Sequence, residues 1–411
     1  METETPAVRF KDDLGNDFPS WETVPLGEIA DIKLGKMLDK EKHTSGHLLP
    51  YLNNISLRWN DVDTSNLPQM YFKDSELERF GLKTGDVIVC EGGEPGRSAI
   101  WDGRLPNLKF QKAIHRVRFS VPYKAALLVL YLQRIVGSNR FEMLFTGGGI
   151  KHLTRETFAK LKVPKPSLPE QQKIADFLTA VDRRVGQLIQ KKALLEDYKK
   201  GVMQQLFTQA IRFKDDHGND FPDWQEKKLG EVLEIKSGLS LDQNGNAAGF
   251  KVTRIETISD RTVNLDKVGY VETEKDIEDF RLLPGDILFS NINSVSHIGK
   301  VAFVDRDYDL YQGMNLLRLR PNPESDPKFV FQLLSSVPFI RYFQRICNQA
   351  VSQASINQTD LKNTPLKAPS PNEQTKIANF LSAIDRKIES VATQITETQT
   401  FKRGLLQQMF V

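Results

Sequence analysis

The sequence contains the same pattern twice, at a constant offset of 203 residues. Three pairs of segments carry the repeat: 9–35 with 212–238, 170–184 with 373–387, and 199–207 with 402–410. In the first pair, 17 of 27 positions are identical. The stretches between them, 36–169 and 239–372, each span 134 residues and hardly resemble one another. An internal repeat constrains a fold more than local patterns do, and this one predicts a single scaffold used twice to recognise two different things.

The composition fits an ordinary folded protein, with 39% hydrophobic and 27% charged residues. A formal net charge of +3 neither demands nor excludes nucleic acid, because local patches matter more than the sum. The two cysteines, Cys90 and Cys347, occupy unrelated positions in the two repeats, which argues against a disulfide framework and fits a reducing compartment. We find no signal-peptide pattern and no apolar run long enough for a membrane span, so we expect neither.

The two unlike stretches, called here the first body (36–169) and the second body (239–372), carry alternating strand and helix signals. Runs of β-branched and apolar residues bounded by Gly, Asn and Asp predict strands at 85–89, 116–119, 285–289 and 316–320. Helical stretches are predicted near 125–136 and 328–334. We therefore predict an α/β (α+β) class, with a twisted, mixed and mostly antiparallel sheet in each body.

A proline-rich segment closes each body, and a long helical pattern follows it. Proline cannot continue a strand ladder and fits the start of a helix, so helices are predicted at 170–207 and 373–410. Apolar residues recur every seven positions in two rows along each helix. In the first helix these are Ile174, Val181, Leu188, Leu195 and Val202, beside Leu178, Val185 and Leu206; in the second they are Ile377, Ile384, Val391 and Leu405, beside Leu381, Ile388, Ile395 and Met409. This spacing predicts a coiled-coil seam.

Neither helix can hide such a seam alone, so we predict that the two helices pair antiparallel, with the bodies related by an approximate two-fold axis. The sequence leaves open the alternative that each helix packs on its own body. The predicted division is a first domain with its N-terminal arm (1–168), a central helix (169–208), a second domain (209–371) and a C-terminal helix (372–411).

A search for catalytic motifs is negative. The phosphate-loop pattern is absent, and its nearest match, at 297–301, lacks the upstream glycine and the hydroxyl residue. The glycine-rich segment 147–150 has no strand-then-helix context, and His43 and His47 have no nearby third metal ligand. No nucleophile elbow is present. We therefore expect a chain that is not an enzyme by itself and that has no metal site.

Polar, planar and basic side chains gather in the parts of the bodies where the two copies diverge. Arg, Asn, Gln and Glu match base edges with paired hydrogen bonds, and Lys and Arg hold phosphates. As candidate DNA-contacting residues we select Arg58, Asn60, Arg97, Gln111 and Lys112 in the first body, and Asn291, Asn293, His297, Asn315, Gln353 and Asn357 in the second. For each residue taken alone, a solvated loop or a turn cap remains the alternative.

The junctions between bodies and helices carry a family resemblance. The strings Pro-Glu-Gln-Gln-Lys-Ile-Ala-Asp-Phe-Leu (169–178) and Glu-Gln-Thr-Lys-Ile-Ala-Asn-Phe-Leu (373–381), the Leu-Gly-Glu segments and the Gly-Asp strands resemble the specificity subunit of type I restriction–modification systems over nearly the whole chain. Asn372 intrudes between Pro371 and Glu373, and we expect it to shift the second junction by one residue.

The resemblance implies a function. The bodies would be target recognition domains, each reading one half of a split, asymmetric site in double-stranded DNA, while the helices set the spacer and dock two methyltransferase subunits. Restriction (translocase) subunits would join them, and S-adenosylmethionine, ATP and magnesium would belong to those partners, with no cofactor in this chain. A cytoplasmic location in a bacterium or archaeon follows, with no membrane partner. Helix faces away from the seam, including Lys191, Lys192, Lys199 and Lys200, are expected to dock the partners.

Two other functions explain parts of the sequence. A coiled-coil adaptor whose paired domains bind proteins or glycans accounts equally well for the repeat and for the missing catalytic motifs. An enzyme with an unfamiliar site is the third possibility, and methylation or cleavage by the isolated chain would support it.

Overall fold

The computed structural model describes residues 6–38, 45–145, 151–243, 247–349 and 353–410. It divides into two compact units, residues 1–189 with 393–411 and residues 190–392. Each unit therefore holds one body together with half of each long helix. This grouping differs from the division by segments predicted above, which stays a prediction. His43 and the glycine-rich segment 147–150 lie outside the described residues.

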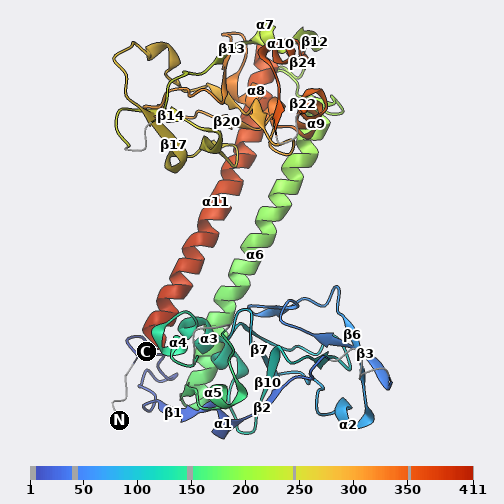
Figure 1. Cartoon of the computed structure of the whole chain (residues 1–411), viewed down its shortest axis with the longest axis vertical. Helices are drawn as coiled ribbons and strands as arrows, with labels where there is room; N and C mark the ends of the chain where they lie inside the picture. The colour runs from blue at the N-terminus through green and yellow to red at the C-terminus, as the bar shows by residue number, and fades with distance from the viewer. Residues whose placement is uncertain (1–5, 39–44, 146–150, 244–246, 350–352, 411) are drawn as a thin grey trace. The chain divides into compact units, whose positions relative to one another are not determined.

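The first unit is built around an antiparallel sheet in the order β2-β10-β7-β8 (Figure 1). Its elements are β1 (Glu22–Pro25), α1 (Leu26–Ile29), β2 (Ala30–Leu34), β3 (His47–Leu52), β4 (Leu57–Arg58), β5 (Asp61–Val62), β6 (Gln69–Phe72), α2 (Asp74–Leu77), β7 (Val87–Cys90), β8 (Ser98–Ile100), β9 (Lys109–Phe110), β10 (Ile114–Phe119), α3 (Ala125–Ile135), α4 (Asn139–Glu142), α5 (Arg155–Ala159) and β11 (Lys162–Lys165). A second sheet, β6-β3-β9, contains one parallel pair. Strand β7 is buried at all four positions, as expected for an unbroken apolar run in the middle of a sheet.

The second unit repeats this plan with a longer sheet, β13-β21-β18-β20-β16-β15, in which one pair is parallel. Its elements are β12 (Gln225–Lys228), α7 (Leu229–Val232), β13 (Leu233–Ser237), β14 (Phe250–Thr253), η1 (Ile255–Thr257), β15 (Ile258–Ser259), β16 (Thr262–Val263), η2 (Leu265–Lys267), β17 (Val268–Val271), η3 (Glu278–Phe280), β18 (Ile287–Phe289), β19 (Ile292–Asn293), β20 (Val301–Phe303), β21 (Leu317–Pro321), α8 (Pro327–Leu334), α9 (Val337–Ile346), β22 (Asn348–Gln349), β23 (Ala354–Ser355), α10 (Gln358–Lys362) and β24 (Pro365–Ala368). The predicted α/β class with mixed, mostly antiparallel sheets is confirmed.

The Gly-Asp motif before each central strand has a structural role. Asp86 receives two hydrogen bonds from Arg118, both of 2.7 Å, and also accepts one from the backbone N–H of Lys83. In the second unit, Asp286 makes the equivalent pair with Arg320, at 2.7 and 2.8 Å. Both aspartates are almost fully buried, so each needs these partners to offset the loss of water. The motif therefore fixes the turn into the sheet.

A buried glutamate at the start of each long helix explains the Pro-Glu-Gln junction. Glu170 accepts hydrogen bonds from Arg9, at 3.0 and 2.7 Å, and from the indole N–H of Trp21, at 2.9 Å. Its side chain is fully buried, so the two donors replace its water. We call this trio the first clasp, because it ties the N-terminal arm to the helix.

The second clasp consists of Arg212, Trp224 and Glu373. Its hydrogen bonds measure 3.1 and 2.8 Å from Arg212 and 3.1 Å from Trp224. Glu373 lies one repeat offset after Glu170 and makes the same contacts, so the shift that we expected from Asn372 is wrong. Asn372 substitutes for Pro169 in the repeat, and it displaces nothing.

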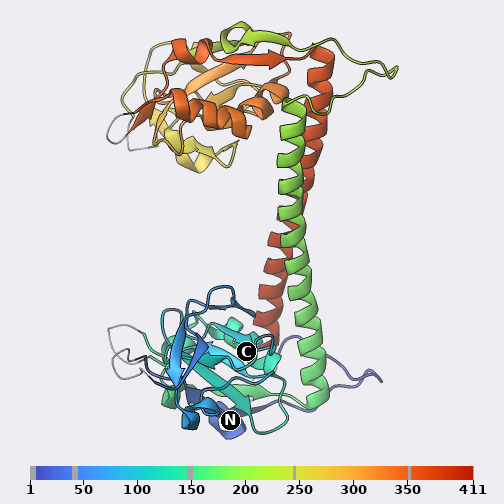
Figure 2. The same cartoon turned by 90° about the vertical axis from the view of Figure 1, so that its right-hand side faces the viewer.

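The two long helices, α6 (Leu168–Phe207) and α11 (Pro371–Met409), run antiparallel within each unit (Figure 2). In the first unit, Ile174 and Leu178 of α6 share a core with Leu406 and Met409 from the end of α11. In the second unit, Leu206 from the end of α6 shares a core with the start of α11. The predicted pairing of the helices is thus confirmed, and each helix end also packs on the body of its unit.

A polar network joins the first body to both helices. Lys402 of α11 donates hydrogen bonds to Asp182 of α6, at 2.6 and 2.8 Å, and to Gln133 of α3, at 2.7 Å. Gln133 donates to the Asn60 side chain at 2.8 Å, and Asn60 donates to Asp182 at 3.2 Å. Asn60 lies in the β4–β5 turn with a φ of 63°. We call these four residues the first joint.

The second joint has the same plan in the second unit. Lys199 of α6 donates to Asp385 of α11 at 2.6 Å, and Gln332 of α8 donates to the same carboxylate at 2.7 Å. Arg261, with a φ of 69° in the β15–β16 turn, donates to Gln332 at 2.9 Å. The second joint therefore carries an arginine where the first has Asn60.

The joints correct one expectation about the helix surface. Lys199 is only 4% exposed and faces the seam, so the prediction that it lies on an outward docking face is wrong. Its position continues the second apolar row, seven residues before Leu206. Lys191 and Lys200 are exposed, and Lys192 pairs with Glu196 at 2.6 Å on the same helix.

Candidate nucleic-acid interface

The loops that follow the two central strands occupy equivalent places in the repeat. After β7, the carbonyl of Glu91 accepts a hydrogen bond from the N–H of Leu153 at 2.8 Å. After β18, the carbonyl of Asn291 accepts one from the N–H of Ile356 at 2.9 Å. The N–H of Glu91 donates to the carbonyl of Ala113 at 2.9 Å. Three loops that are distant in sequence therefore meet at the end of the central strand of the first body.

The repeated glycine that ends each opening segment allows this close approach. A Cβ atom at Gly35 would lie 2.3 Å from the carbonyl oxygen of Gln111, and one at Gly238 would lie 2.0 Å from that of Gly313. Only glycine fits such contacts with backbone atoms. The identity of this residue in both repeats thus has a packing cause, and it sets the position of the loops around Gln111 and Gly313.

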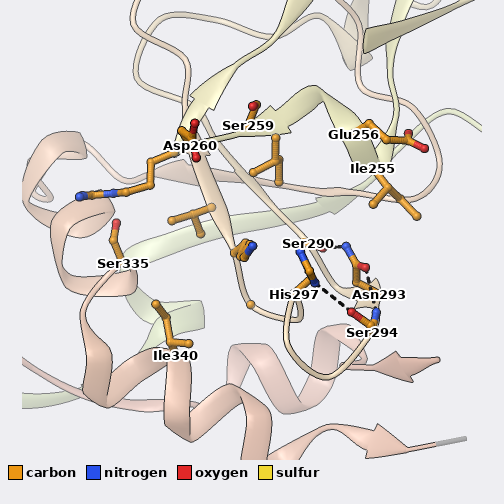
Figure 3. Close-up of a pocket in the computed structure, with 15 residues that line it drawn as sticks. Ile255, Glu256, Ser259, Asp260, Ser290, Asn293, Ser294, His297, Ser335 and Ile340 are labelled. Atoms are coloured by element: carbon orange, nitrogen blue, oxygen red, sulfur yellow. Dashed lines mark hydrogen bonds between the residues drawn. The ribbon is translucent and has the colours of Figure 1, made fainter. Parts of the chain in front are cut away.

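The second body contains a cavity of about 650 Å³ beside its central strand, lined by polar and apolar side chains (Figure 3). Asn293 donates to the hydroxyl of Ser290 at 3.1 Å and accepts from the N–H of Ser294 at 2.8 Å. His297 Nδ1 lies 3.0 Å from Ser294 Oγ and 2.9 Å from Ser296 Oγ. Figure 3 shows Asn293, Ser294 and His297 grouped on one loop, facing the β15–β16 turn across the cavity. The cavity thus brings together two of the predicted residues and several hydroxyl groups.

Three of the candidates in the first body are engaged within the protein. Arg58 is exposed and donates to the carbonyl of Ile55 at 2.8 Å. Asn60 belongs to the first joint. Arg97 is 13% exposed and donates to Glu94 at 2.7 Å and to the carbonyl of Asn54 at 2.6 Å. The contacts of Asn60 and Arg97 hold loops in place, so a direct contact of either residue with DNA would have to break them.

Gln111 and Lys112 lie in the loop next to Glu91. Gln111 is half-buried and Lys112 is exposed. Burial raises the pKa of Glu91 above its ordinary value, while the nearby His152 and Lys112 act in the opposite direction. This carboxyl group is therefore surrounded by polar and basic groups at the end of a central strand. Our sequence-based selection omitted Glu91 and His152. The sequence did contain a signal for Glu91, because this acidic residue follows a buried strand directly and is itself followed by two glycines.

The remaining candidates in the second body differ in their surroundings. Asn315 and Gln353 are exposed. Asn291 is half-buried, and its Oδ1 atom has no hydrogen-bond partner among the described residues. Asn357 caps α10, because its Oδ1 accepts from the N–H of Asp360 at 2.8 Å while its Nδ2 donates to the Asp360 carboxylate at 2.7 Å. The contacts of Asn357 match the turn-cap alternative that its sequence position left open.

The described residues hold no group of three His, Cys, Asp or Glu side chains that could bind a metal ion. In the same residues, no helix is both long and apolar enough to cross a membrane.

Comparisons with known proteins give one consistent assignment. A family model described as "Type I restriction modification DNA specificity domain" matches residues 19–196 and again residues 222–399. The MjaVIII type I restriction enzyme specificity subunit of Methanocaldococcus jannaschii is 26% identical over 97% of this chain and 94% of its own length. A putative MjaX specificity subunit from the same organism is 41% identical, over 50% of this chain and 49% of that relative.

A solved structure shares the fold over the whole length. The S subunit of a type I restriction–modification system from M. genitalium aligns over 99% of both chains with a TM-score of 0.60 and 17% sequence identity. Both matches of the family model include a body and part of a long helix, in agreement with the repeated clasps and joints. The chain therefore belongs to the type I restriction–modification specificity family and is a specificity subunit that carries the family's domain twice.

Proposed function

We propose that this chain recognises a bipartite, asymmetric site in double-stranded DNA and itself catalyses no reaction. One observation carries the proposal: the clasps and joints are repeated, whereas the loops at the end of the central strands differ between the bodies. A scaffold that is the same twice, with unlike side chains at equivalent loop positions, suits two readers of two different half-sites.

The loops supply the chemistry for reading base edges. Glu91 and Gln111 in the first body, and Asn291, Asn293, Asn315 and Gln353 in the second, carry the paired donors and acceptors that distinguish base pairs in the major groove. Lys112 and His297 bring cationic or hydrogen-bonding groups that suit phosphates. Arg58, Asn60, Arg97 and Asn357 remain candidates, and their internal contacts favour roles in positioning the loops.

The long helices set the spacing. Two readers on one face of a duplex have half-sites about one helical turn apart, roughly 10–10.5 base pairs between centres. The base pairs between the half-sites would then be unread. Because the two bodies differ, the two half-sites would differ as well, and the complete site would lack two-fold symmetry.

Partners complete the activity. Two methyltransferase subunits would dock on the outward faces of the helices, including Lys191 and Lys200, and restriction (translocase) subunits would join that complex. S-adenosylmethionine, ATP and magnesium would be bound by those subunits. This function locates the chain in the cytoplasm of a bacterium or archaeon, where the host DNA is.

The decisive experiment is co-expression with the cognate methyltransferase, followed by mapping of modified adenines in the host genome. We expect one bipartite motif with two unlike halves. A single short motif, a palindrome or no modification would contradict the proposal. The adaptor alternative makes a different prediction, because a chain that binds proteins or glycans would show no preference for one bipartite duplex over shuffled DNA.

A further inference from the structure

A groove of about 670 Å³ lies within the second unit, next to the second joint. The end of α6, the β15–β16 turn, the first turn of α9 and one side of α11 line it. Apolar side chains form much of its wall, namely Met203, Phe207, Val337, Pro338 and Ile388. Its volume is in the range of small-molecule sites, which are mostly apolar with a few polar groups.

The N-terminus of α9 opens into this groove with an unused hydroxyl group. Ser336 is the N-cap residue and is 4% exposed, yet its side chain makes no capping hydrogen bond. Its Oγ atom has no hydrogen-bond partner among the described residues. In the first turn of this ten-residue helix Pro338 has no N–H and Ile340 donates to the Ser336 carbonyl at 3.0 Å, so Val337 and Phe339 carry the free N–H groups at the positive end of the helix dipole. Ser336 and Val337 both line the groove, so an anionic group at this end of the helix would be stabilised.

The charges around the groove favour an anion as well. Four cationic side chains line it (Lys199, Lys200, Arg261 and Arg341) against three acidic ones (Glu196, Asp260 and Asp385). Two of the acids already have cationic partners, because Asp385 pairs with Lys199 and Glu196 pairs with Lys192. The Nε atom of Arg261 is buried and has no hydrogen-bond partner in the described part of the chain.

The first unit lacks this constellation at the equivalent residues. Asn60 occupies the place of Arg261 in the joint. Ser138, which precedes α4 as Ser336 precedes α9, does cap its helix, because its Oγ accepts from the N–H of Phe141 at 3.4 Å. Helix α4 is also only four residues long. A partner that docks twice on the repeat needs two similar sites, so this groove suits an occupant present once per chain.

We propose that the groove binds a small organic anion, with its carboxylate or phosphate group at the N-terminus of α9 and its apolar body against Met203, Phe207 and Ile388. The charged group would accept hydrogen bonds from the Ser336 hydroxyl and the N–H of Val337, and Arg341, one turn further along α9, would supply a positive charge. This inference does not depend on DNA recognition, and it can be tested without DNA.

The test is calorimetric titration of the full-length chain with three probes: 4-phenylbutyrate, 4-phenylbutanol and inorganic phosphate. We expect 4-phenylbutyrate to bind at one site per chain, and the neutral alcohol and inorganic phosphate to bind at least about tenfold more weakly, because each lacks one half of the recognition. Absence of 4-phenylbutyrate binding at millimolar concentration, or equal binding of all three probes, would overturn the proposal.

Two variants locate the site. Ser336→Ala and Arg341→Gln should each weaken the binding of 4-phenylbutyrate by about tenfold, because the first removes a hydroxyl donor and the second removes a positive charge. Ser138→Ala in the first unit is the matched control and should leave binding unchanged. Arg341 is exposed, so its replacement leaves the core intact and reports on the site itself. If neither variant alters binding, or if Ser138→Ala alters it equally, the groove is not the binding site.

Discussion

Lys199 and Lys402 lie one repeat offset apart, and each donates a hydrogen bond of 2.6 Å to an aspartate on the other long helix. Both lysines occupy the second apolar row of their helix, where a coiled coil ordinarily carries a hydrophobic residue. A polar residue at such a position specifies register at a cost in stability. Each joint therefore fixes the register in which the two long helices can pair.

The aspartates of the joints can be tested by removing one partner or both. Asp385→Ala leaves the buried Lys199 ammonium without its counter-ion, and we expect it to lower the free energy of unfolding by about 3 kcal/mol. The double variant Lys199→Met/Asp385→Leu should cost much less, because no unpaired charge remains. Chemical denaturation of both variants measures the difference. Equal losses in the two variants would show that the pair does not act as an ion pair.

Alkaline pH tests the environment of Lys199. Burial, with a contribution from the Arg261 charge, lowers the pKa of Lys199 from 10.5 to about 8. Between these values the unfolded chain binds the proton and the folded chain does not, so this group makes the free energy of unfolding rise as the pH increases from about 8 to 10.5. The Lys199→Met variant should lack that increment, whereas Lys200→Met should keep it. Denaturation curves across this pH range measure the free energy of unfolding at each pH. If this free energy has the same pH dependence in wild type and in Lys199→Met, the lowered pKa of Lys199 is refuted.

The first clasp should hold the N-terminal arm in place. Glu170→Ala removes the acceptor of Arg9 and Trp21, and we expect a loss of about 1–3 kcal/mol, because the half-buried Arg9 guanidinium and the Trp21 indole N–H both lose this acceptor. Limited proteolysis should then cut between residues 9 and 21. Asp17→Ala is the control: its ion pair with Lys11 is exposed on both sides and is expected to contribute less than about 1 kcal/mol. Resistance of the arm to protease in Glu170→Ala would contradict the role of the clasp.

Glu91 and Asn291 provide a test of base reading at equivalent positions. Glu91→Gln should relax or change one position of the first half-site, at a cost of about 1–3 kcal/mol, and leave the second half-site unchanged. Asn291→Ala should relax or change one position of the second half-site and leave the first half-site unchanged. Mapping of methylated adenines for each variant reports both halves at once, with Glu28→Gln, an exposed residue of α1, as the control that should alter neither half. Changes in both halves from a single substitution would argue against independent reading.

The spacing role of the helices predicts a further outcome. Insertion of one heptad into each long helix, between Asp182 and Lys199 and between Asp385 and Lys402, keeps both joints and should change the length of the unread spacer while leaving both half-sites intact. The inserted residues must repeat the apolar positions of the seam so that pairing is kept. The same adenine mapping gives the result. Altered half-sites with an unchanged spacer would refute the spacing role.

Much of the fold could be predicted from this one sequence, because the repeat and the seven-residue spacing are periodic signals. The helix pairing and the central Gly-Asp strands belong to this class. The burial of Lys199 could also have been predicted, because Lys199 lies seven residues before Leu206 and so belongs to the second apolar row. The prediction placed it on the outside because its charge was given more weight than its register.

The loop residues were less predictable for a physical reason. Asn60 was selected for its amide group, yet it lies in a left-handed turn, and its partners Gln133 and Asp182 belong to α3 and α6, which are far away in sequence. Arg97 is likewise held by the carbonyl of Asn54, a contact that local sequence does not encode. Side-chain type suggests which groups can read a base, whereas long-range packing decides which of them are free to do so.

The two clasps use the same three residue types, and in each one the body lies in the sequence between the Trp and the Glu of the clasp. Nothing in the Arg–Glu–Trp contacts depends on which loops that body carries. We therefore expect segments 36–169 and 239–372, which are equal in length, to be exchangeable between the two clasps. We expect a chain in which the two segments are exchanged to fold as before and to recognise the same two half-sites in the opposite order along the duplex.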